Sequence, residues 1–421
     1  MAQKLLTMTW ITYESLRVLH NICGFTRGSN REYNKEFSVG GAKIGSVCNV
    51  RLPNRYYTVE QTALLAQDTS EQTVPVTLTT PWQTSLNFSE IDLLLSADDF
   101  SKRFILPAMC SIAAKIDVRG MQQSLNIYNQ VGTPGTIPGT SGGSATGLAQ
   151  YNSPAIFLMA GALMDKFSVP RDGRRSCYLE PFAQANSVNG LSGLLNPSQY
   201  LGENFRTGTL GNALGYEFFS TPNTTILTTG NRAGTPLVNG AGQTGSNLVT
   251  NGWTAGTTIN QGEIFTIAGV QSVNPENQQT NGVSANFVVT ATTTADSNGN
   301  MTIPIAPAII VANTNPANGP LTAYGTVTAS PAMGAALTLA SGSANTSYIT
   351  SIANHQDAFT LATADLMIPG GVDYAARENY EGISMAIVRA FDINTRNMPT
   401  RVDVLGGWAT LRAELACRLT S

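Results

Sequence analysis

Apolar residues recur at helical spacing in three stretches of the chain. In residues 1–23 the apolar positions roughly follow helical spacing with polar residues between them, and the pattern predicts an amphipathic helix that ends near Gly24. A second stripe follows Ser96, with Asp98 and Asp99 near the positive end of the helix dipole, and continues as far as Tyr128. It predicts a helix of about thirty residues, in which a proline at position 107 either introduces a kink or marks where the regular part begins.

The third helical stretch follows Ser153 and Pro154, a capping hydroxyl before a proline at the first helical position. Four apolar residues then recur on one face: Ile156, Met159, Leu163 and Phe167. The pattern predicts a helix that ends before Val169 and Pro170.

Short extended segments replace the helical pattern between residues 31 and 88. Residues 47–52 and 74–78 predict strands interrupted by prolines, and the residues between them are polar and weakly patterned. We expect a long, protruding, hairpin-like loop with little core of its own, since loops of this length are usually functional.

Strand signals dominate the second half of the chain. They are bounded by Gly, Asn or Pro, and Asn298-Gly299 is the strongest short hairpin turn among them. The predicted strands are 176–179, 264–270, 287–291, 301–305, 383–393 and 402–405, while 359–366 suits either a strand or a helix.

Charge is almost missing from one internal block. Between Ser220 and Ala353 the charged residues are Arg232, Glu263, Glu276 and Asp296, and the other 47 of the 51 charged residues lie elsewhere. Because the charge-poor block is internal, it predicts a β-rich domain, residues 225–345, inserted into a host domain made from both flanks. So few charges also lead us to expect that no salt bridge supports its folding.

Composition narrows the classes of function. The chain has 421 residues, a size that favours several domains, and its net charge of -3 disfavours a free-standing nucleic-acid-binding protein. No apolar run approaches about 18 residues, so a membrane span is not expected. Charged residues near the start are unlike a signal peptide, which favours a cytosolic origin.

The cysteines and histidines do not form a recognisable site. The cysteines are spread along the chain without a paired motif, which predicts buried free thiols: Cys23, Cys48, Cys110, Cys177 and Cys417. His20 and His355 are the only imidazoles, and we expect His355, beside Asp357, to be a packed or interface residue.

Residues 296–300 resemble the beginning of a calcium loop. Asp296, Asn298 and Asn300 occupy its first three ligand positions, but Met301 replaces the required glycine and Pro307 the required glutamate. A hairpin turn explains the same residues better.

Three other groups of residues favour structural roles. Adjacent carboxylates at Asp98 and Asp99 suit dipole capping better than acid–base catalysis. The basic cluster Arg171, Arg174 and Arg175 suits a solvated turn or a subunit interface, because no aromatic residues are interleaved with it. Residues 142–144 lack the lysine of a phosphate loop. We therefore predict no catalytic, cofactor-binding or metal-binding residue.

Several segments resemble the major capsid proteins of tailed bacteriophages, in the group similar to the P22 coat protein. The segment 265–289, FTIAGVQSVNPENQQTNGVSANFVV, is the most specific. The others are 37–48 and 50–53 near the predicted loop, 98–101 and 107–109 in the long helix, and 355–359, 366–369 and 401–406 near the end.

The resemblance implies an α+β, HK97-like capsid fold. It divides the chain into an N-terminal arm (1–30), an extended loop (31–90), a peripheral domain with a spine helix and the first part of an axial domain (91–224), a six-stranded β-barrel-like insertion (225–345) and the return to the axial and peripheral domains (346–421). It implies a structural protein of the virion, not an enzyme and without a cofactor, assembled in the bacterial cytoplasm.

The implied partners are copies of the chain in pentamers and hexamers, a scaffolding protein, a portal protein, packaged double-stranded DNA bound without sequence specificity, and in some systems a decoration protein. A secreted β-rich adhesin or surface-layer protein is the alternative, which would need a signal peptide and extracellular repeats. A carboxylate-based hydrolase is a third class, which would need paired carboxylates in a deep pocket.

Two expectations concern individual segments. Removing Met1 to Gly24 should leave the body folded but block correct shell closure, because an amphipathic arm can bury its apolar stripe only on other parts of the assembly. A charge at Ile267 or Val289 should cost several kcal/mol, whereas one at Asn277 or Gln278 should cost within about half a kcal/mol.

Overall fold

The computed structural model describes residues 15, 19, 24–31, 47–58, 67, 71–78, 81–89, 106–132, 155–191, 210–313, 322–339, 342–380, 383–394 and 397–420. The fold is α+β, and the chain forms two compact units. Unit 1 combines Met1–Leu52, Thr73–Met121 and Phe359–Leu411. Unit 2 combines Pro53–Gln72, Gln122–Ala358 and Arg412–Ser421.

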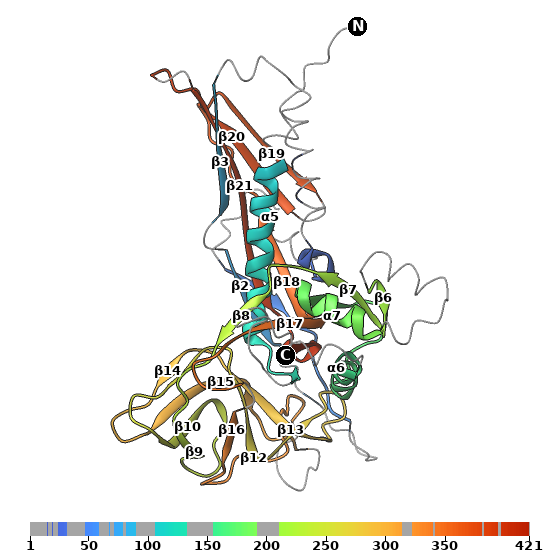
Figure 1. Cartoon of the computed structure of the whole chain (residues 1–421), viewed down its shortest axis with the longest axis vertical. Helices are drawn as coiled ribbons and strands as arrows, with labels where there is room; N and C mark the ends of the chain where they lie inside the picture. Colours follow the sequence, from blue (N-terminus) through green and yellow to red (C-terminus); the bar gives the residue numbers. More distant parts are fainter. Residues whose placement is uncertain are drawn as a thin grey trace. The chain divides into compact units, whose positions relative to one another are not determined.

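Unit 1 is built on a five-stranded antiparallel sheet (Figure 1). Its strands are β3 (Trp82–Ser89), β18 (Phe359–Ala364), β19 (Tyr374–Tyr380), β20 (Ile383–Arg389) and β21 (Asn397–Thr410). The long β21 organises the sheet, because its second half pairs with β18 and its first half pairs with β3 and β20. The segment 359–366, which suited either a strand or a helix, is therefore a strand over most of its length.

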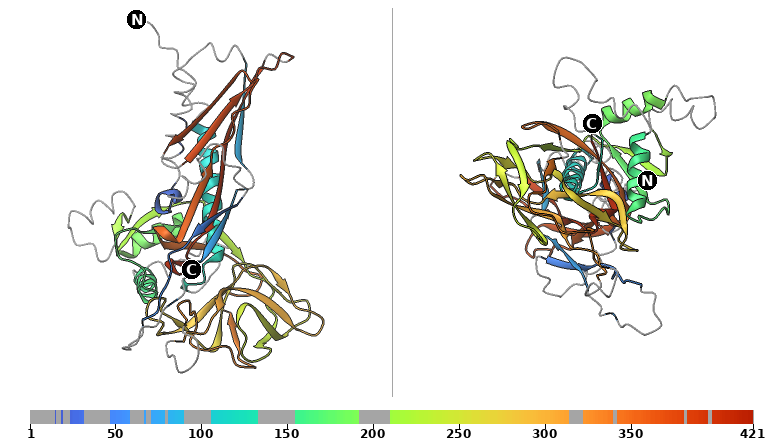
Figure 2. Two further views of the ribbon diagram at one scale, coloured as in Figure 1. Left: turned by 180° about the vertical axis from the view of Figure 1, so that it is seen from behind. Right: turned by 90° about the horizontal axis from the view of Figure 1, so that it is seen from below.

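Helix α5 (Leu106–Met121) packs on this sheet and is seen nearly end-on in the right view of Figure 2. Its buried face joins Met109, Ile112 and Ile116 to strand residues such as Val404. Pro107 is the second residue of α5, and residues 96–105 of the predicted helix lie outside the described residues, so both alternatives for this proline stay predictions.

The predicted thirty-residue helix is wrong at its C-terminal end. The α-helix stops at Met121 and continues as the 3-10 helix η3 (Gln122–Asn126). Gly120 precedes the stop, and glycine is a poor helix former. Tyr128, the last residue of the stripe, is buried in unit 2 against Phe167.

The N-terminal residues that the structure describes belong to the core of unit 1. Leu19 is buried in the same cluster as α5, and η1 (Phe25–Gly28) packs its Phe25 ring against Phe359 and Trp408. Asn30 exchanges backbone hydrogen bonds with Phe359 and Leu361. The premise that the arm buries its stripe only on other subunits is therefore wrong for Leu19.

The predicted strands 47–52 and 74–78 form the antiparallel pair β1 (Val47–Arg51) and β2 (Thr73–Thr77). The expectation that this hairpin lacks a core is wrong, because Val50 and Val76 are buried with Ala362 and Leu411. Gly407 explains the close packing: a Cβ there would lie 2.3 Å from the Thr77 carbonyl oxygen.

Unit 2 contains a seven-stranded mixed sheet in the order β4-β22-β17-β5-β7-β6, with β8 also paired to β17. Its strands are β4 (Gln130–Val131), β5 (Arg175–Leu179), β6 (Asn212–Ala213), β7 (Tyr216–Ser220), β8 (Thr225–Thr228), β17 (Ser347–His355) and β22 (Ala416–Thr420). Every residue of β5 and β22 is buried, as is typical of strands covered on both faces. The described helices of this unit are η3 (Gln122–Asn126), α6 (Ala155–Lys166), α7 (Pro181–Leu191), η7 (Gln356–Ala358) and η8 (Ala413–Leu415).

Helix α6 confirms the predicted third helix, but its buried face differs from the predicted one. Ile156, Phe157 and Met164 are buried, whereas Met159 is exposed. The apolar positions cover more than one side of this helix, so spacing alone did not identify the buried face.

The charge-poor block folds into a six-stranded sheet that we call the inserted barrel (Figure 1). Its order is β16-β12-β13-β15-β10-β9, and the bridge Leu237↔Ala336 joins the two edges. The strands are β9 (Gly234–Val238), β10 (Gly245–Trp253), β12 (Ile264–Val273), β13 (Thr280–Val289), β15 (Met301–Ile309) and β16 (Leu337–Leu339), with β11 (Thr258–Ile259) and β14 (Thr293–Thr294) as a separate pair.

The barrel confirms the predicted strands 264–270 and 301–305. The strand predicted at 287–291 is longer and begins earlier, because β13 begins at Thr280 and ends at Val289. The predicted turn is also present: Gly299 has a φ of 75° and its N–H donates to the Asp296 carbonyl. Ile267 and Val289 both lie in the barrel core.

Candidate assembly surfaces

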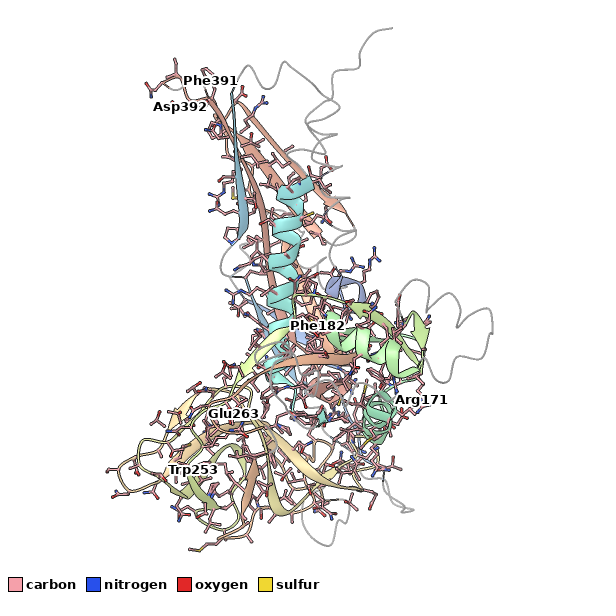
Figure 3. All side chains as sticks on the ribbon, viewed as in Figure 1. Arg171, Phe182, Trp253, Glu263, Phe391 and Asp392 are labelled. Atoms are coloured by element: carbon pink, nitrogen blue, oxygen red, sulfur yellow. The ribbon has the colours of Figure 1, made fainter. Side chains whose placement is uncertain are left out.

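Large apolar side chains are exposed at two loops of unit 1. Met367 and Ile368 lie in the loop between β18 and β19, and Met367 is 91% exposed. Phe391, labelled in Figure 3, and Ile393 lie between β20 and β21, and Ile393 is 80% exposed. Because these residues occur in neighbouring pairs, each loop presents an apolar surface that a second molecule could cover.

Unit 2 also exposes apolar side chains on its helices. Leu158 and Met159 are exposed on α6, and Phe182 is 61% exposed at the start of α7 (Figure 3). The inserted barrel exposes Met333. Apolar side chains that stay in water contribute no burial free energy to the folded chain. We therefore consider them candidate contacts with other subunits.

A hollow of about 420 Å³ lies on unit 1, beside α5 and β3. Its lining residues are Pro81, Trp82, Gln83, Thr84, Ser111, Ile112, Lys115 and Arg119. Lys115 and Arg119 are one helical turn apart, and none of the described residues that line the hollow is a carboxylate. This hollow therefore does not supply the paired carboxylates that a hydrolase would need.

The four charged residues of the charge-poor block have different environments. Glu263 and Arg232 form a buried ion pair, with Arg232 Nε 2.5 Å from Glu263 Oε2. Glu276 is exposed in the loop after β12. The expectation that no salt bridge supports this block is therefore wrong, because it holds a fully buried one.

Asp296 uses its carboxylate within its own turn. Oδ1 accepts hydrogen bonds from the N–H groups of Asn298 and Asn300, both at 2.8 Å. These bonds hold the pKa of Asp296 below its usual value. Within the described part of the chain, no group of three His, Cys, Asp or Glu residues could hold a metal ion.

The predicted basic cluster lies in the connection between α6 and β5, where two of its arginines pair with a carboxylate of α6. Arg171 and Arg175 both pair with Asp165, whose pKa these interactions lower. Arg175 is buried and also donates to the carbonyls of Val169 and Pro170. The prediction of a solvated turn or interface is therefore wrong for Arg175, whereas Arg171 and Arg174 are exposed.

His355 is buried, as expected, with Nε2 3.2 Å from Asp172 Oδ1. Its Nδ1 accepts a hydrogen bond from the Asp357 N–H, so the proton is on Nε2 in the neutral ring. The ring therefore connects β17 to the turn before β5.

The prediction of buried thiols holds for two of the three cysteines whose side chains are described. Cys177 and Cys417 are buried, and burial raises the pKa of Cys417 to about 12. Cys110 is exposed on α5, so the prediction is wrong there. Asp98, Asp99, His20, Cys23 and residues 142–144 lie outside the described residues.

A family model described as "P22 coat protein - gene protein 5" matches residues 58–419. The chain belongs to the P22 coat protein family. It is therefore a major capsid protein of tailed-phage heads, a structural component of the virion that assembles into a shell with copies of itself. Its α+β fold with an inserted barrel is the HK97-like fold that the resemblance implied.

Two of the solved phage structures that are similar to the chain cover most of its length, and a third covers a quarter of it. Mycobacterium phage Che8 is 11% identical, with a TM-score of 0.45, covering 94% of this chain and 90% of that chain. The capsid structure of cyanophage P-SCSP1u is 9% identical, with a TM-score of 0.39, covering 90% and 84%. The CUS-3 coat protein I-domain is 26% identical, with a TM-score of 0.19, covering 25% of this chain and 94% of that chain.

Among curated proteins, none matches the chain. In the described residues, no helix combines the length and apolar character that crossing a membrane requires. The assignment as a capsid protein therefore rests on the family match. A capsid protein contacts other subunits, and the exposed apolar loops are the candidate surfaces for those contacts.

Proposed function

We propose that the chain forms the pentamers and hexamers of an icosahedral head that encloses double-stranded DNA. Assembly is guided by a scaffolding protein, and one vertex is closed by a portal protein. The DNA is held without sequence-specific contacts. No residue of the chain has a catalytic, cofactor-binding or metal-binding role.

The observation that carries this proposal is the pairing of exposed apolar residues at separate places on the surface. One copy of the chain leaves Met367 and Ile368, Phe391 and Ile393, and Leu158 and Met159 in water. A closed shell buries many such modest contacts at once, so each can stay weak and reversible while the whole is stable.

Net charge supports the container role. At -3 for 421 residues, the chain has no strong overall attraction to DNA phosphates. A strongly basic lining would hold the DNA that the head must release.

We also propose the division into an arm (1–30), an extended loop (31–90), peripheral and axial parts (91–224 and 346–421) and an insertion (225–345). All six barrel strands lie within 225–345, which supports the insertion. β8 pairs with β17 in the seven-stranded sheet, so the insertion leaves that sheet after Thr228.

The test is to replace Phe391 and Ile393 together by Asp in the chain expressed with its scaffolding protein. The expected result is folded subunits by circular dichroism but no shells by gradient sedimentation and negative-stain microscopy. Asn394→Asp is the matched control on the same exposed loop, and it should give normal shells. Normal shells from the double variant would show that this loop is not an assembly contact.

A further inference from the structure

The two chain segments that connect the inserted barrel to the seven-stranded sheet run side by side. The Thr229 N–H donates to the Thr346 carbonyl at 2.9 Å, and the Thr346 N–H donates to Thr229 Oγ1 at 2.9 Å. The Asn345 N–H donates to the Gly230 carbonyl at 3.0 Å. We call residues 229–232 and 342–346 the neck of the insertion.

A buried carboxylate holds this neck together. Glu263 is 0% exposed, and its Oε1 accepts from the N–H groups of Gly230 and Asn260, both at 2.7 Å. Its Oε2 pairs with Arg232, whose Nη1 donates to the Gly342 carbonyl at 2.7 Å. The pair therefore joins the first neck segment to the second and to the turn 260–263 (Figure 3 labels Glu263).

The same turn is bound from the other side by Arg418 of β22. Arg418 is 0% exposed, and it donates from Nε to the Ser124 carbonyl at 2.6 Å and from Nη1 to the Gly262 carbonyl at 2.5 Å. Among the described residues, no carboxylate forms an ion pair with Arg418. Burial lowers its pKa to about 10, so the guanidinium stays charged near neutral pH.

Gly262 allows the turn to approach the rest of unit 2 closely. Its φ is +89°, and a Cβ at this position would lie 2.7 Å from Leu125 Cδ2 and 2.9 Å from Leu227 Cδ1. Leu125 belongs to η3 and Leu227 to β8. Two consecutive residues thus face opposite partners, Gly262 towards the seven-stranded sheet and Glu263 towards the neck.

A buried guanidinium bound only to carbonyls is expensive to desolvate, and general stability would be served as well by an apolar side chain of similar size. Directional hydrogen bonds to two separate segments fix the position of one segment relative to the other. An apolar side chain does not impose such a fixed position. Arg418 joins η3 to the turn in this way.

We propose that the turn 260–263 is a joint that holds the inserted barrel in one orientation on the seven-stranded sheet. Arg418 is its positioning residue, and the Glu263–Arg232 pair is the clasp that connects the joint to the neck. The barrel folds without the joint, but shell assembly requires the orientation that the joint sets.

The first test is hydrogen exchange of the full-length soluble subunit carrying Arg418→Met, which keeps side-chain bulk but removes both hydrogen bonds. We expect the amides of the neck and of the turn 260–263 to exchange at least about tenfold faster than in the unmodified chain, while those of β12 and β13 do not change. Arg412→Met is the matched control, because Arg412 pairs with Glu414 of η8 and, among the described residues, forms no hydrogen bond with the turn 260–263.

Three outcomes would overturn the proposal. Unchanged exchange in the neck would show that Arg418 does not hold the joint, and equal loosening of the barrel strands would show that it supports general stability instead. Arg418→Lys keeps the charge and can reach one carbonyl, so it should stay soluble with intermediate exchange. Loss of soluble subunit for both the Met and the Lys variant would mark Arg418 as an ordinary core residue.

The second test concerns the clasp and uses assembly as its readout. Glu263→Gln leaves Arg232 buried beside an amide, so shells should be lost or irregular, whereas Glu263→Gln with Arg232→Gln should restore a large part of normal assembly. Equal defects in the single and double variants would overturn the clasp. Because exchange is measured on the subunit before assembly, a failure of the joint is distinguishable from a failure of the proposed pentamers and hexamers.

Discussion

The inserted barrel and the helix-backed sheet of unit 1 obtain their cores from the chain in opposite ways. Every core residue of the barrel falls between Val238 and Leu337. The core of unit 1 combines Leu19 with residues of α5 and with strand residues as distant as Val404. One region can form from a continuous segment, whereas the other needs both ends of the polypeptide.

This difference has a physical consequence for folding. Contacts between distant residues require large loops to close before any burial is gained, so unit 1 bears more of the entropy cost of ordering the chain. The barrel bears less of it and is closed by its own strands. A coat subunit built this way has one self-sufficient part and one part that depends on the completed chain.

Expression of residues 229–346 alone tests whether the barrel is self-sufficient. We expect a folded monomer with a dispersed proton NMR spectrum, because about 120 residues can support an independent core. Melting should change little with salt, because the Arg232–Glu263 pair is buried and poorly screened. A disordered spectrum at a monomeric concentration would show that the barrel also depends on the host.

A charge in the barrel core should have the next largest effect. Ile267→Asp buries an unpaired carboxylate among core residues such as Phe287 and should cost about 3–5 kcal/mol of barrel stability. Ala268→Asp is the matched control, because the next residue on the same strand is exposed. Chemical denaturation of the fragment measures both, and equal costs for the two variants would contradict the assigned strand register.

Gly120 offers a probe of the distant contacts in unit 1. Alanine usually stabilises a helix relative to glycine, but a Cβ here would lie 2.4 Å from Phe25 Cδ1 and 2.9 Å from Trp408 Cζ2. We therefore expect Gly120→Ala to cost about 2 kcal/mol through overpacking.

Gly161→Ala in α6 is the control for helix propensity, because its Cβ would lie 3.2 Å from the Tyr216 hydroxyl oxygen, the nearest heavy atom. It should be neutral or slightly stabilising in thermal unfolding. A stabilising Gly120→Ala would mean that Phe25 is not packed against α5.

The loop after β12 corrects one expectation from the sequence. Asn277 is exposed, but Gln278 is buried and donates from Nε2 to the carbonyls of Pro275 and Ala323. Gln278→Glu should therefore cost about 1–2 kcal/mol, whereas Asn277→Asp should stay within about half a kcal/mol. Denaturation of the same fragment tests the pair, and equal effects would contradict the burial of Gln278.

The sequence predicted the barrel better than unit 1, because the core residues of the barrel are close together in the sequence and those of unit 1 are not. Ile264, Ile267 and Val270 lie within one strand, and a compositional boundary separates their domain from its host. Nothing near Leu19 or Tyr128 in the sequence shows which distant residues pack against it, so the arm and the long helix were misassigned in part.

Charged residues were also predicted correctly where their partners are close in the sequence and missed where their partners are distant. Asp296 was correctly assigned to a turn, because its partners are two and four residues away. Arg418 and Glu263 gave no local signal, since Arg418 binds carbonyls 156 and 294 residues away. One indication was present for Glu263: it is one of the few charged residues in a charge-poor block, and a charge among apolar residues needs a partner if it is buried.

Asp117 gives the smallest and most selective test, because it joins α5 to the N-terminal residues of unit 1. Its carboxylate accepts from the N–H groups of Gly24 at 3.0 Å and Phe25 at 3.3 Å, yet burial outweighs these bonds and raises its pKa to about 6. In the unfolded chain the carboxyl titrates near about 4. The folded state therefore holds the proton more tightly, and the resulting stabilisation is fully present below about pH 4 and lost as the pH rises through about 6.

Between pH 5 and pH 7 this group alone should lower the free energy of unfolding by on the order of 1 kcal/mol. Asp117→Asn should remove that part of the pH dependence, because the amide keeps an acceptor for one N–H and does not ionise. The measurement is the difference in unfolding free energy between the two proteins at pH 5 and at pH 7, which cancels the other carboxylates. A difference that does not change with pH would show that the N-terminal residues do not bury Asp117, and the dependence of unit 1 on the distant end of the chain would then be weaker than the comparison requires.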